Sequence, residues 1–327
     1  MQRCLLTTPE WQEFLTALPT ASFFQSPAWM HRLERCLPGL ISRPYCFRFD
    51  DGTRILWPVM HKANRLFYRL AALPLGLYGS PLVEGTWSRW KGQAILNALV
   101  SGRVRNLQYV EHPLLARLEL DCPPGITQEC QTSETHVLPL DADWETTWAT
   151  FPARVRNQVR RAEKEGLHVR AGTSAHDIDT FYALYTLTAR GWGQEPPPYS
   201  RDFFTALFDP PDAHIQLLLV ELEQTAVAAG IFVEDTASVL YWFGAMDREY
   251  ACIFPNYLLL TDRIRHAIAH GKRYFNMGAS DRLGNVRHFK ELWHAEPVPY
   301  RHFTYKSCGV FPRTSRRLDV TDCSIGE

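Results

Sequence analysis

The sequence has no surplus of charge of either sign. Its 35 lysines and arginines balance 35 aspartates and glutamates over 327 residues, whereas a protein built mainly to hold DNA usually carries a net positive charge. No stretch of about 18 residues is free of both charge and proline, so no membrane-spanning segment is expected. The amino terminus lacks the apolar core of a signal peptide. These absences favour a soluble, globular, cytoplasmic protein with no DNA partner.

Paired cysteines are also lacking. The eight cysteines form no CxxC pair, and none stands at zinc-finger spacing from two histidines. We therefore expect scattered, mostly buried thiols in a reducing compartment. His266 and His270 lie four residues apart in a predicted helix, but no third ligand is nearby. A solvated or hydrogen-bonded histidine pair is expected there, and the sequence predicts no metal.

Several common enzyme motifs are missing. The sequence has no GxSxG, HExxH, GxxxxGK[ST] or GxGxxG motif, which disfavours an α/β-hydrolase, a zinc protease, a P-loop enzyme and a dinucleotide-binding fold. What the chain does have is a hydrophobic content of 46% and an aromatic content of 13%. With this length, it predicts two folded domains or one large one.

The order of predicted elements repeats along the chain. A strand–turn–strand pattern, a helix and a further strand occur at 41–60, 87–101 and 104–110, and again at 213–234, 254–270 and 273–278. This order predicts two copies of one α/β unit, with domains at 1–140 and 141–327. The pattern also predicts one helix over 142–165, strands at 115–120 and 134–139, and a loop with a basic–aromatic segment between the strand at 273–278 and a final strand.

A basic run lies in the predicted helix that opens the second half. Arg156, Arg160 and Lys164 are successively one helical turn apart, so they share a face. That face either neutralises a phosphate-bearing substrate or is a solvated surface that complements the helix carboxyl terminus. Both interpretations remain open at this point.

Seven segments resemble, in the same order, the FemAB-like proteins of the GNAT (N-acyltransferase) superfamily. They are Phe23-Phe24-Gln25-Ser26-Pro27-x-Trp29, Arg156-Asn157-x-x-Arg160-Arg161-Ala162-x-Lys164-x-Gly166-Leu167, Thr188-x-Arg190, Leu240-Tyr241-Trp242-Phe243-Gly244-Ala245, Asn256-x-Leu258-Leu259, Gly271-x-x-x-Phe275-x-x-Gly278 and Phe289-Lys290-x-x-Trp293-x-Ala295. The resemblance covers nearly the whole chain and is strongest over 151–305.

The resemblance implies a fold and an activity. The expected fold is two tandem GNAT-like units packed together, each an α/β unit around a mixed sheet. The expected activity is transfer of an acyl group to an amine of a cell-envelope or polysaccharide-related acceptor. Acyl-CoA is the favoured donor, because the neutral charge balance and the lack of an inserted coiled-coil arm disfavour tRNA. The alternatives are an aminoacyl-tRNA-dependent peptidoglycan-bridge enzyme and a non-catalytic GNAT-like binding protein.

One departure from typical GNAT enzymes bears on the donor. The glycine-rich loop that holds the acetyl-CoA pyrophosphate is absent after the strand at 238–245. Asp247-Arg248-Glu249-Tyr250 stands in its place.

Three residues are the candidates for catalysis. By resemblance, Lys290 stabilises the tetrahedral intermediate or a substrate phosphate, and its neighbours Phe289 and Trp293 would desolvate its ammonium. Tyr241 would supply a hydroxyl near the transferred carbonyl. Asp281 is a candidate general base for the attacking amine.

Five further residues are candidates for substrate binding: Arg156, Arg160, Arg190, Asn256 and Ser280. Arg190 ends a predicted helix, where it either clamps an anion or caps that helix. Asn256 either contacts the substrate or is the helix N-cap. Ser280 belongs to a short glycine-bounded loop at 278–284 that either lines a ligand site or is an ordinary turn.

Overall fold

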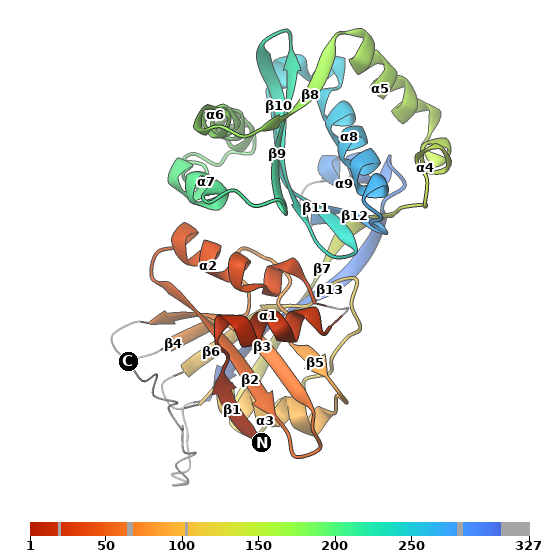
Figure 1. The fold of residues 1–327 in the computed structure, drawn as a ribbon. Coiled ribbons are helices and arrows are strands. Elements are labelled where there is room, and N and C mark those ends of the chain that lie inside the picture. The colour runs from red at the N-terminus through yellow and green to blue at the C-terminus, as the bar shows by residue number, and fades with distance from the viewer. Residues whose placement is uncertain (19–20, 64–67, 102–103, 280–283, 309–327) are drawn as a thin grey trace. The chain divides into compact units, whose positions relative to one another are not determined.

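The computed structural model describes residues 1–18, 21–63, 68–101, 104–279 and 284–308. The chain divides into two compact units (Figure 1). The first comprises Met1–Glu34, Pro38–Thr132 and the chain from Tyr300 onward, and the second comprises Arg35–Leu37 and Ser133–Pro299.

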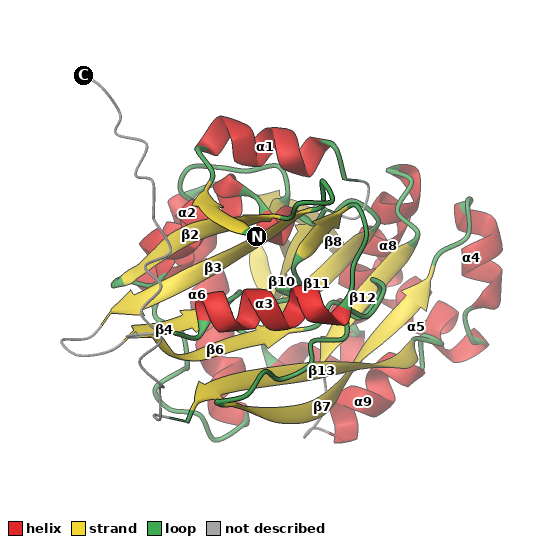
Figure 2. Cartoon of the chain, turned by 90° about the horizontal axis from the view of Figure 1, so that it is seen from below, coloured by secondary structure: helices red, strands yellow, loops and turns green. Residues whose placement is uncertain are grey.

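The first unit is built around a mixed sheet. Its elements in chain order are β1 (Gln2–Leu5), α1 (Thr8–Thr16), η1 (Phe23–Gln25), α2 (Pro27–Cys36), β2 (Leu40–Arg48), β3 (Arg54–Ala63), β4 (Tyr68–Ala71), β5 (Leu82–Glu84), α3 (Arg89–Leu99) and β6 (Val104–Val110). The strand order is β1-β2-β3-β4-β6, and β5 pairs with β3. All pairs are antiparallel except β4 and β6. The helix α3, which lies across the sheet in Figure 2, precedes β6.

The second unit repeats this plan. Its elements are α4 (Trp144–Thr150), α5 (Ala153–Lys164), β8 (Leu167–Gly172), α6 (Ala175–Gly191), α7 (Arg201–Phe208), β9 (Ile215–Leu222), β10 (Thr225–Glu234), β11 (Ser238–Met246), η2 (Arg248–Ile253), α8 (Pro255–Ala269), β12 (Tyr274–Ala279) and α9 (Gly284–Glu291). The strand order is β8-β9-β10-β11-β12, and β11 and β12 are parallel. Helices α6 and α7 cover one face of this sheet, and α5 and α8 cover the other (Figure 1).

The last strand of each half completes the sheet of the other half. Strand β7 (Ile126–Pro139) follows β6 in the chain, but its residues Thr135–Pro139 pair with β12. Strand β13 (Glu296–Ser307) follows α9, but its residues His302–Lys306 pair with β6. The two units therefore share one strand order, and each receives the strand next to its parallel pair from the sequence of the other.

Each unit has a hydrophobic core of its own. In the first, α3 packs Ile95, Leu96 and Leu99 on the sheet, and Phe303 and Tyr305 from β13 join this cluster. In the second, the apolar faces of α5 and α8 pack on β9–β12. The contribution of β13 to the first core explains why the unit is incomplete without the end of the chain.

Three predicted elements need correction. The helix expected over 142–165 is two helices, α4 and α5, because Phe151 is extended (ψ 140°) before Pro152. Residues 115–120 form no strand, and β7 begins earlier than expected. The basic–aromatic segment, for which no helix was predicted, contains α9, whose eight residues are too few to give a clear helical period.

The thiols are also more exposed than expected. Only Cys36 and Cys46 are buried among the cysteines of the described ranges, whereas Cys130, Cys252 and Cys308 are exposed. Among those same ranges, no helix is long and apolar enough to cross a bilayer.

Candidate functional site

Two parallel strands separate in the second unit and leave an opening. Strands β11 and β12 pair only at Ser238–Leu240 with Tyr274–Asn276, although they continue to Met246 and Ala279. A β-bulge at Trp242 shifts the register of β11 against β10, which bends the strand at this point. We call this opening the notch. A ligand in an α/β sheet commonly binds where parallel strands end beside a helix amino terminus.

The notch is a cavity of about 770 Å³. Its walls come from the ends of α6, β11 and β12, the start of α8, and α9. The lining residues are Thr188, Gly191, Trp192, Tyr241, Trp242, Gly244, Ala245, Met246, Arg248, Asn256, Met277, Gly278, Ala279, Gly284, Asn285, Val286, Phe289 and Lys290. This volume is in the range of small-molecule sites.

The first unit closes the equivalent opening. Beyond the β4–β6 ladder, the Ala72 amide donates to Gln108 (2.7 Å) and the Gly79 amide donates to Val110 (2.8 Å). The Trp57 indole donates to the Gly79 carbonyl at 2.9 Å. The backbone of the first unit thus fills the space that is open in the second unit.

Tyr241 presents its hydroxyl to the notch. Its ring stacks on Phe232 at 5.1 Å between centroids, and the hydroxyl lies against Gly244, where an added Cβ would overlap it. Burial raises the pKa of Tyr241 well above its usual value of 10. The group is therefore a neutral phenol at physiological pH, which donates a hydrogen bond and does not act as a base.

Lys290 lies in α9 and is buried, with 4% of its surface exposed. Its ammonium donates to the carbonyl oxygens of Gly278 (2.7 Å) and Ala279 (2.8 Å). The side chain therefore ties α9 to the end of β12 and places a positive charge in the wall of the notch.

The amino terminus of α8 also faces the notch. Phe254 is the N-cap in a left-handed conformation (φ 60°), so Asn256 is not the cap. Instead, Asn256 lines the cavity, and its buried Oδ1 has no hydrogen-bond partner within the described ranges. An amide in this position is available to orient a ligand that carries a donor.

The connection η2 between β11 and α8 uses several of its own amides. The Glu249 amide donates to the Asp247 carboxylate (3.0 Å), and the Tyr250 and Phe254 amides donate to carbonyls within the turn (3.2 and 3.3 Å). Arg248 lies against Gly191, to whose carbonyl it donates (3.3 Å). This connection therefore offers a guanidinium and two carboxylates, where a phosphate cradle would offer a run of backbone amides.

The end of α6 supports the opposite rim. Thr188 Oγ1 accepts from the Met246 amide (3.0 Å) and donates to the Met246 carbonyl (3.3 Å). Trp192 follows at the helix end, lines the cavity and remains 44% exposed. Arg190, in contrast, is outside the lining and pairs with Glu195 at 3.0 Å.

The other predicted residues are not in the lining. Arg156 and Arg160 lie on α5, and Arg156 donates to the Ala149 carbonyl at 2.9 Å. Ser280 and Asp281 lie outside the described residues. The structure thus brings Lys290, Tyr241 and Asn256 together at the notch. The sequence prediction did not include Arg248, Thr188 and Trp192, although an arginine between a strand and a helix amino terminus is a signal that would have found Arg248.

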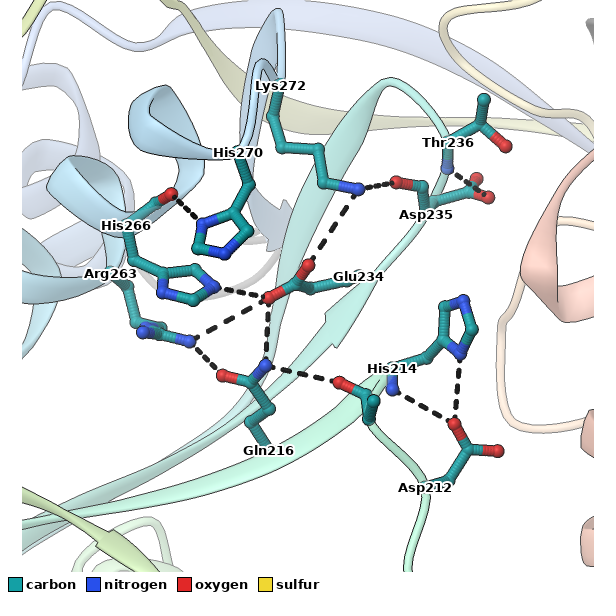
Figure 3. Close-up of polar contacts among 11 residues, drawn as sticks. Asp212, His214, Gln216, Glu234, Asp235, Thr236, Arg263, His266, His270 and Lys272 are labelled. Carbon is teal, nitrogen blue, oxygen red and sulfur yellow. Dashed lines mark hydrogen bonds and ion pairs between the residues drawn. The ribbon is translucent and has the colours of Figure 1, made fainter.

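The histidine pair belongs to a polar cluster at the far end of the same sheet (Figure 3). Glu234, at the end of β10, accepts from His266 (2.8 Å) and from Gln216 (2.9 Å). Arg263 and Lys272 lie 3.9 and 3.8 Å from its carboxylate. His266 stacks on His270, with 3.8 Å between ring centroids. The described part of the chain contains no group of three or more residues that would hold a metal ion.

Comparison with known proteins agrees with this geometry. Residues 150–291, which include every lining residue of the notch given above, match the family model of the acetyltransferase (GNAT) domain. The crystal structure of FemX superposes with a TM-score of 0.68 at 14% identity, over 92% of this chain and 97% of that one. The fold of the chain is similar to that of FemX, and residues 150–291 carry the sequence pattern of a GNAT domain.

Other comparisons bear on the fold of the chain and on its relatives. A tandem GNAT protein from the clavulanic acid biosynthesis pathway superposes with a TM-score of 0.54 at 13% identity, over 95% of this chain and 99% of that one. The predicted fold of two tandem GNAT-like units is therefore confirmed. A curated relative, the UDP-N-acetylmuramoylpentapeptide-lysine N(6)-alanyltransferase of Weissella viridescens, is 23% identical over 177 residues. The match covers 53% of this chain and about half (52%) of the relative.

Proposed function

We propose that the chain transfers an aminoacyl group from the 3′ end of an aminoacyl-tRNA to a primary amine of a peptidoglycan precursor. The observation that carries the proposal is the notch, an open cavity at the ends of two parallel strands whose wall contains a neutral phenol and a buried ammonium. The acceptor class is taken from the alanyltransferase, which shares about a quarter of its residues over the matched half.

The connection η2 favours a nucleic-acid ester over acyl-CoA. A pyrophosphate needs several converging backbone amides, and here at least three of them donate within the turn. The carboxylates of Asp247 and Glu249 add repulsion for a diphosphate. This argument reverses the preference for acyl-CoA that the charge balance suggested. Such donors are made in the cytoplasm, which we propose as the location of the protein.

The exposed ring of Trp192 suits the terminal base of this donor. It stands at the rim of the cavity with 44% of its surface exposed. A flat ring in such a position stacks on a nucleobase, which contributes about 1–3 kcal/mol to binding of a single-stranded end. Arg248, next to it across Gly191, supplies positive charge for the adjoining phosphate.

The reaction is an acyl transfer in which atoms balance. The neutral amine attacks the ester carbonyl carbon, a C–N bond forms, and the C–O bond to the ribose breaks. One amine proton ends on the ribose oxygen that leaves. We propose that the Tyr241 hydroxyl donates a hydrogen bond to the carbonyl oxygen on which negative charge develops. The positive charge of Lys290, in the wall of the notch, stabilises the same negative charge electrostatically. Asp281 remains our proposal for the base, and Asn256 and Ser280 for acceptor contacts.

The test is a donor comparison with purified protein. Alanyl-tRNA and acetyl-CoA are each supplied with a UDP-linked muramyl pentapeptide, and the products are identified by mass. We expect addition of an alanyl group from the RNA donor alone. Acetyl transfer from acetyl-CoA with no alanyl product would contradict the proposed donor, and no product from either would contradict the enzyme assignment.

A further inference from the structure

The exposed face of α5 carries a row of cations that we call the basic stripe. It consists of Arg154, Arg156, Arg160, Arg161 and Lys164. Val155, Val159 and Ala162 form the buried face of this helix. At 3.6 residues per turn, the five cations fall on the side away from these three, and the two glutamates, Glu163 and Glu165, fall at its margins.

Most of the stripe is not neutralised within the protein. Arg161 pairs with Glu165 at 3.5 Å. Arg154, Arg160 and Lys164 are exposed and have no carboxylate partner among the residues that the structure describes. In a chain of zero net charge, this local surplus makes the stripe a specific place for an anion.

The stripe adjoins the rim of the notch. Helix α5 packs against α8, beside which it lies in Figure 1, and also against η2. The Arg161 guanidinium lies 5.4 Å over the Phe254 ring, and Phe254 is the N-cap that precedes Asn256 in the wall of the notch. An extended anion on the stripe would therefore reach the cavity at one end.

We propose that the basic stripe docks the phosphate backbone of the RNA donor next to its aminoacylated end. This inference rests on the proposed function, and it adds the surface that would hold the body of the donor. A helix of 12 residues spans about 18 Å, which is long enough for its cations to lie along several successive phosphates of an RNA strand. An anionic membrane would not need a stripe that ends at the notch, so RNA is the favoured partner.

The test compares two charge reversals of equal size. Arg160→Glu/Lys164→Glu alters the stripe, and the control Lys62→Glu/Arg69→Glu alters two exposed residues that face each other across β3 and β4 of the first unit. Each variant is assayed with alanyl-tRNA and with an alanylated dinucleotide, which is too short to reach the stripe. We expect the stripe variant to raise KM for alanyl-tRNA about tenfold or more, with kcat and the dinucleotide reaction within about twofold. The control should match the wild type.

A binding measurement separates this inference from the proposed function. Fluorescence anisotropy with an RNA hairpin that carries no amino acid should show weaker binding to the stripe variant. The salt dependence of the binding constant should also fall by about two released counterions. The inference would be overturned if the stripe variant bound RNA as well as the wild type does, or if it lost equal activity with alanyl-tRNA and the dinucleotide. It would also be overturned if the variant lost only its binding to anionic phospholipid vesicles. If the wild type uses neither donor, the proposed function fails, and the anisotropy result still decides the role of the stripe.

Discussion

A missing Cβ keeps the Tyr241 hydroxyl in the notch. Because a Cβ at position 244 would overlap that oxygen, Gly244→Ala should push the phenol away from its present position. We expect kcat to fall about 100- to 1,000-fold, the size typical of losing one positioned donor, with the protein still folded. Steady-state kinetics with circular dichroism as the folding check would measure this.

The chain offers a matched control for that variant. Gly284 also lines the notch, but an added Cβ there meets nothing within 4 Å. Gly284→Ala should therefore retain nearly full activity. Equal losses in the two alanine variants would show that the notch is sensitive to any added atom and not to the position of Tyr241.

Tyr241→Phe isolates the hydroxyl from the ring. The ring keeps its stacking on Phe232, so the free energy of unfolding should change little. The rate should fall about 100- to 1,000-fold through loss of one hydrogen bond to the developing charge. Because burial raises the pKa of Tyr241, the wild-type enzyme should show no loss of activity from this phenol at pH 9. A wild-type decline that disappears in Tyr241→Phe would refute the neutral-donor role.

At the scale of elements, sequence periodicity predicted those helices whose position depends on residues near in the sequence. The helices predicted at 87–101 and 254–270 are α3 and α8, whose bounds differ from the prediction by one or two residues at each end. The break at Pro152 was visible in the sequence but was outweighed by the apolar spacing on either side. The bulge at Trp242 had no local signal, because it depends on pairing with β10.

The polar cluster around Glu234 should make stability depend on pH. Burial and the neighbouring Arg263 lower the pKa of His266 from its usual value of 6.5, despite the opposing effect of Glu234. The unfolded chain then binds more protons than the folded one near and below pH 6.5, so the free energy of unfolding falls as the solution is acidified.

His266→Gln tests this dependence. Glutamine keeps a donor for Glu234 but does not titrate, so the pH dependence of stability between pH 7.5 and 5.5 should become shallower. Urea unfolding at several pH values would measure it. Some dependence should remain, because burial also lowers the pKa of His61 and of His136. An unchanged slope would show that His266 does not contribute.

At the scale of the whole molecule, the exchange of final strands ties the first unit to the end of the chain. Tyr305 is fully buried in the first core and stacks near Tyr109 and Phe303. Tyr305→Ala should lower the free energy of unfolding by about 3–4 kcal/mol, measured by urea denaturation. The neighbouring Lys306→Ala removes an exposed ion pair with Glu129 and should cost less than about 1 kcal/mol. A small effect of Tyr305→Ala would show that β13 is dispensable.

Such long-range features are not encoded in local sequence patterns and could not be predicted from them. The repeat of strand pair, helix and strand was visible, because each element has its own period. The pairing of β7 with β12 and of β13 with β6 was not visible, since hydrophobic spacing does not indicate which strands are neighbours. Likewise, the order of the motifs indicated Lys290, Tyr241 and Asn256 as site residues. The sequence did not show that they line one cavity, because that cavity forms where β11 and β12 separate. Trp192 and Thr188 join them only through the fold.

The central claim is that the notch holds the aminoacyl end of an RNA donor. A crystal structure with a stable amide analogue of 3′-alanyl-adenosine tests it most directly. We predict the analogue in the notch, with its carbonyl oxygen within hydrogen-bond distance of the Tyr241 hydroxyl and its adenine beside Trp192. An empty notch with the analogue bound elsewhere, or a notch that accepts the pantetheine arm of acetyl-CoA and excludes the analogue, would contradict the claim.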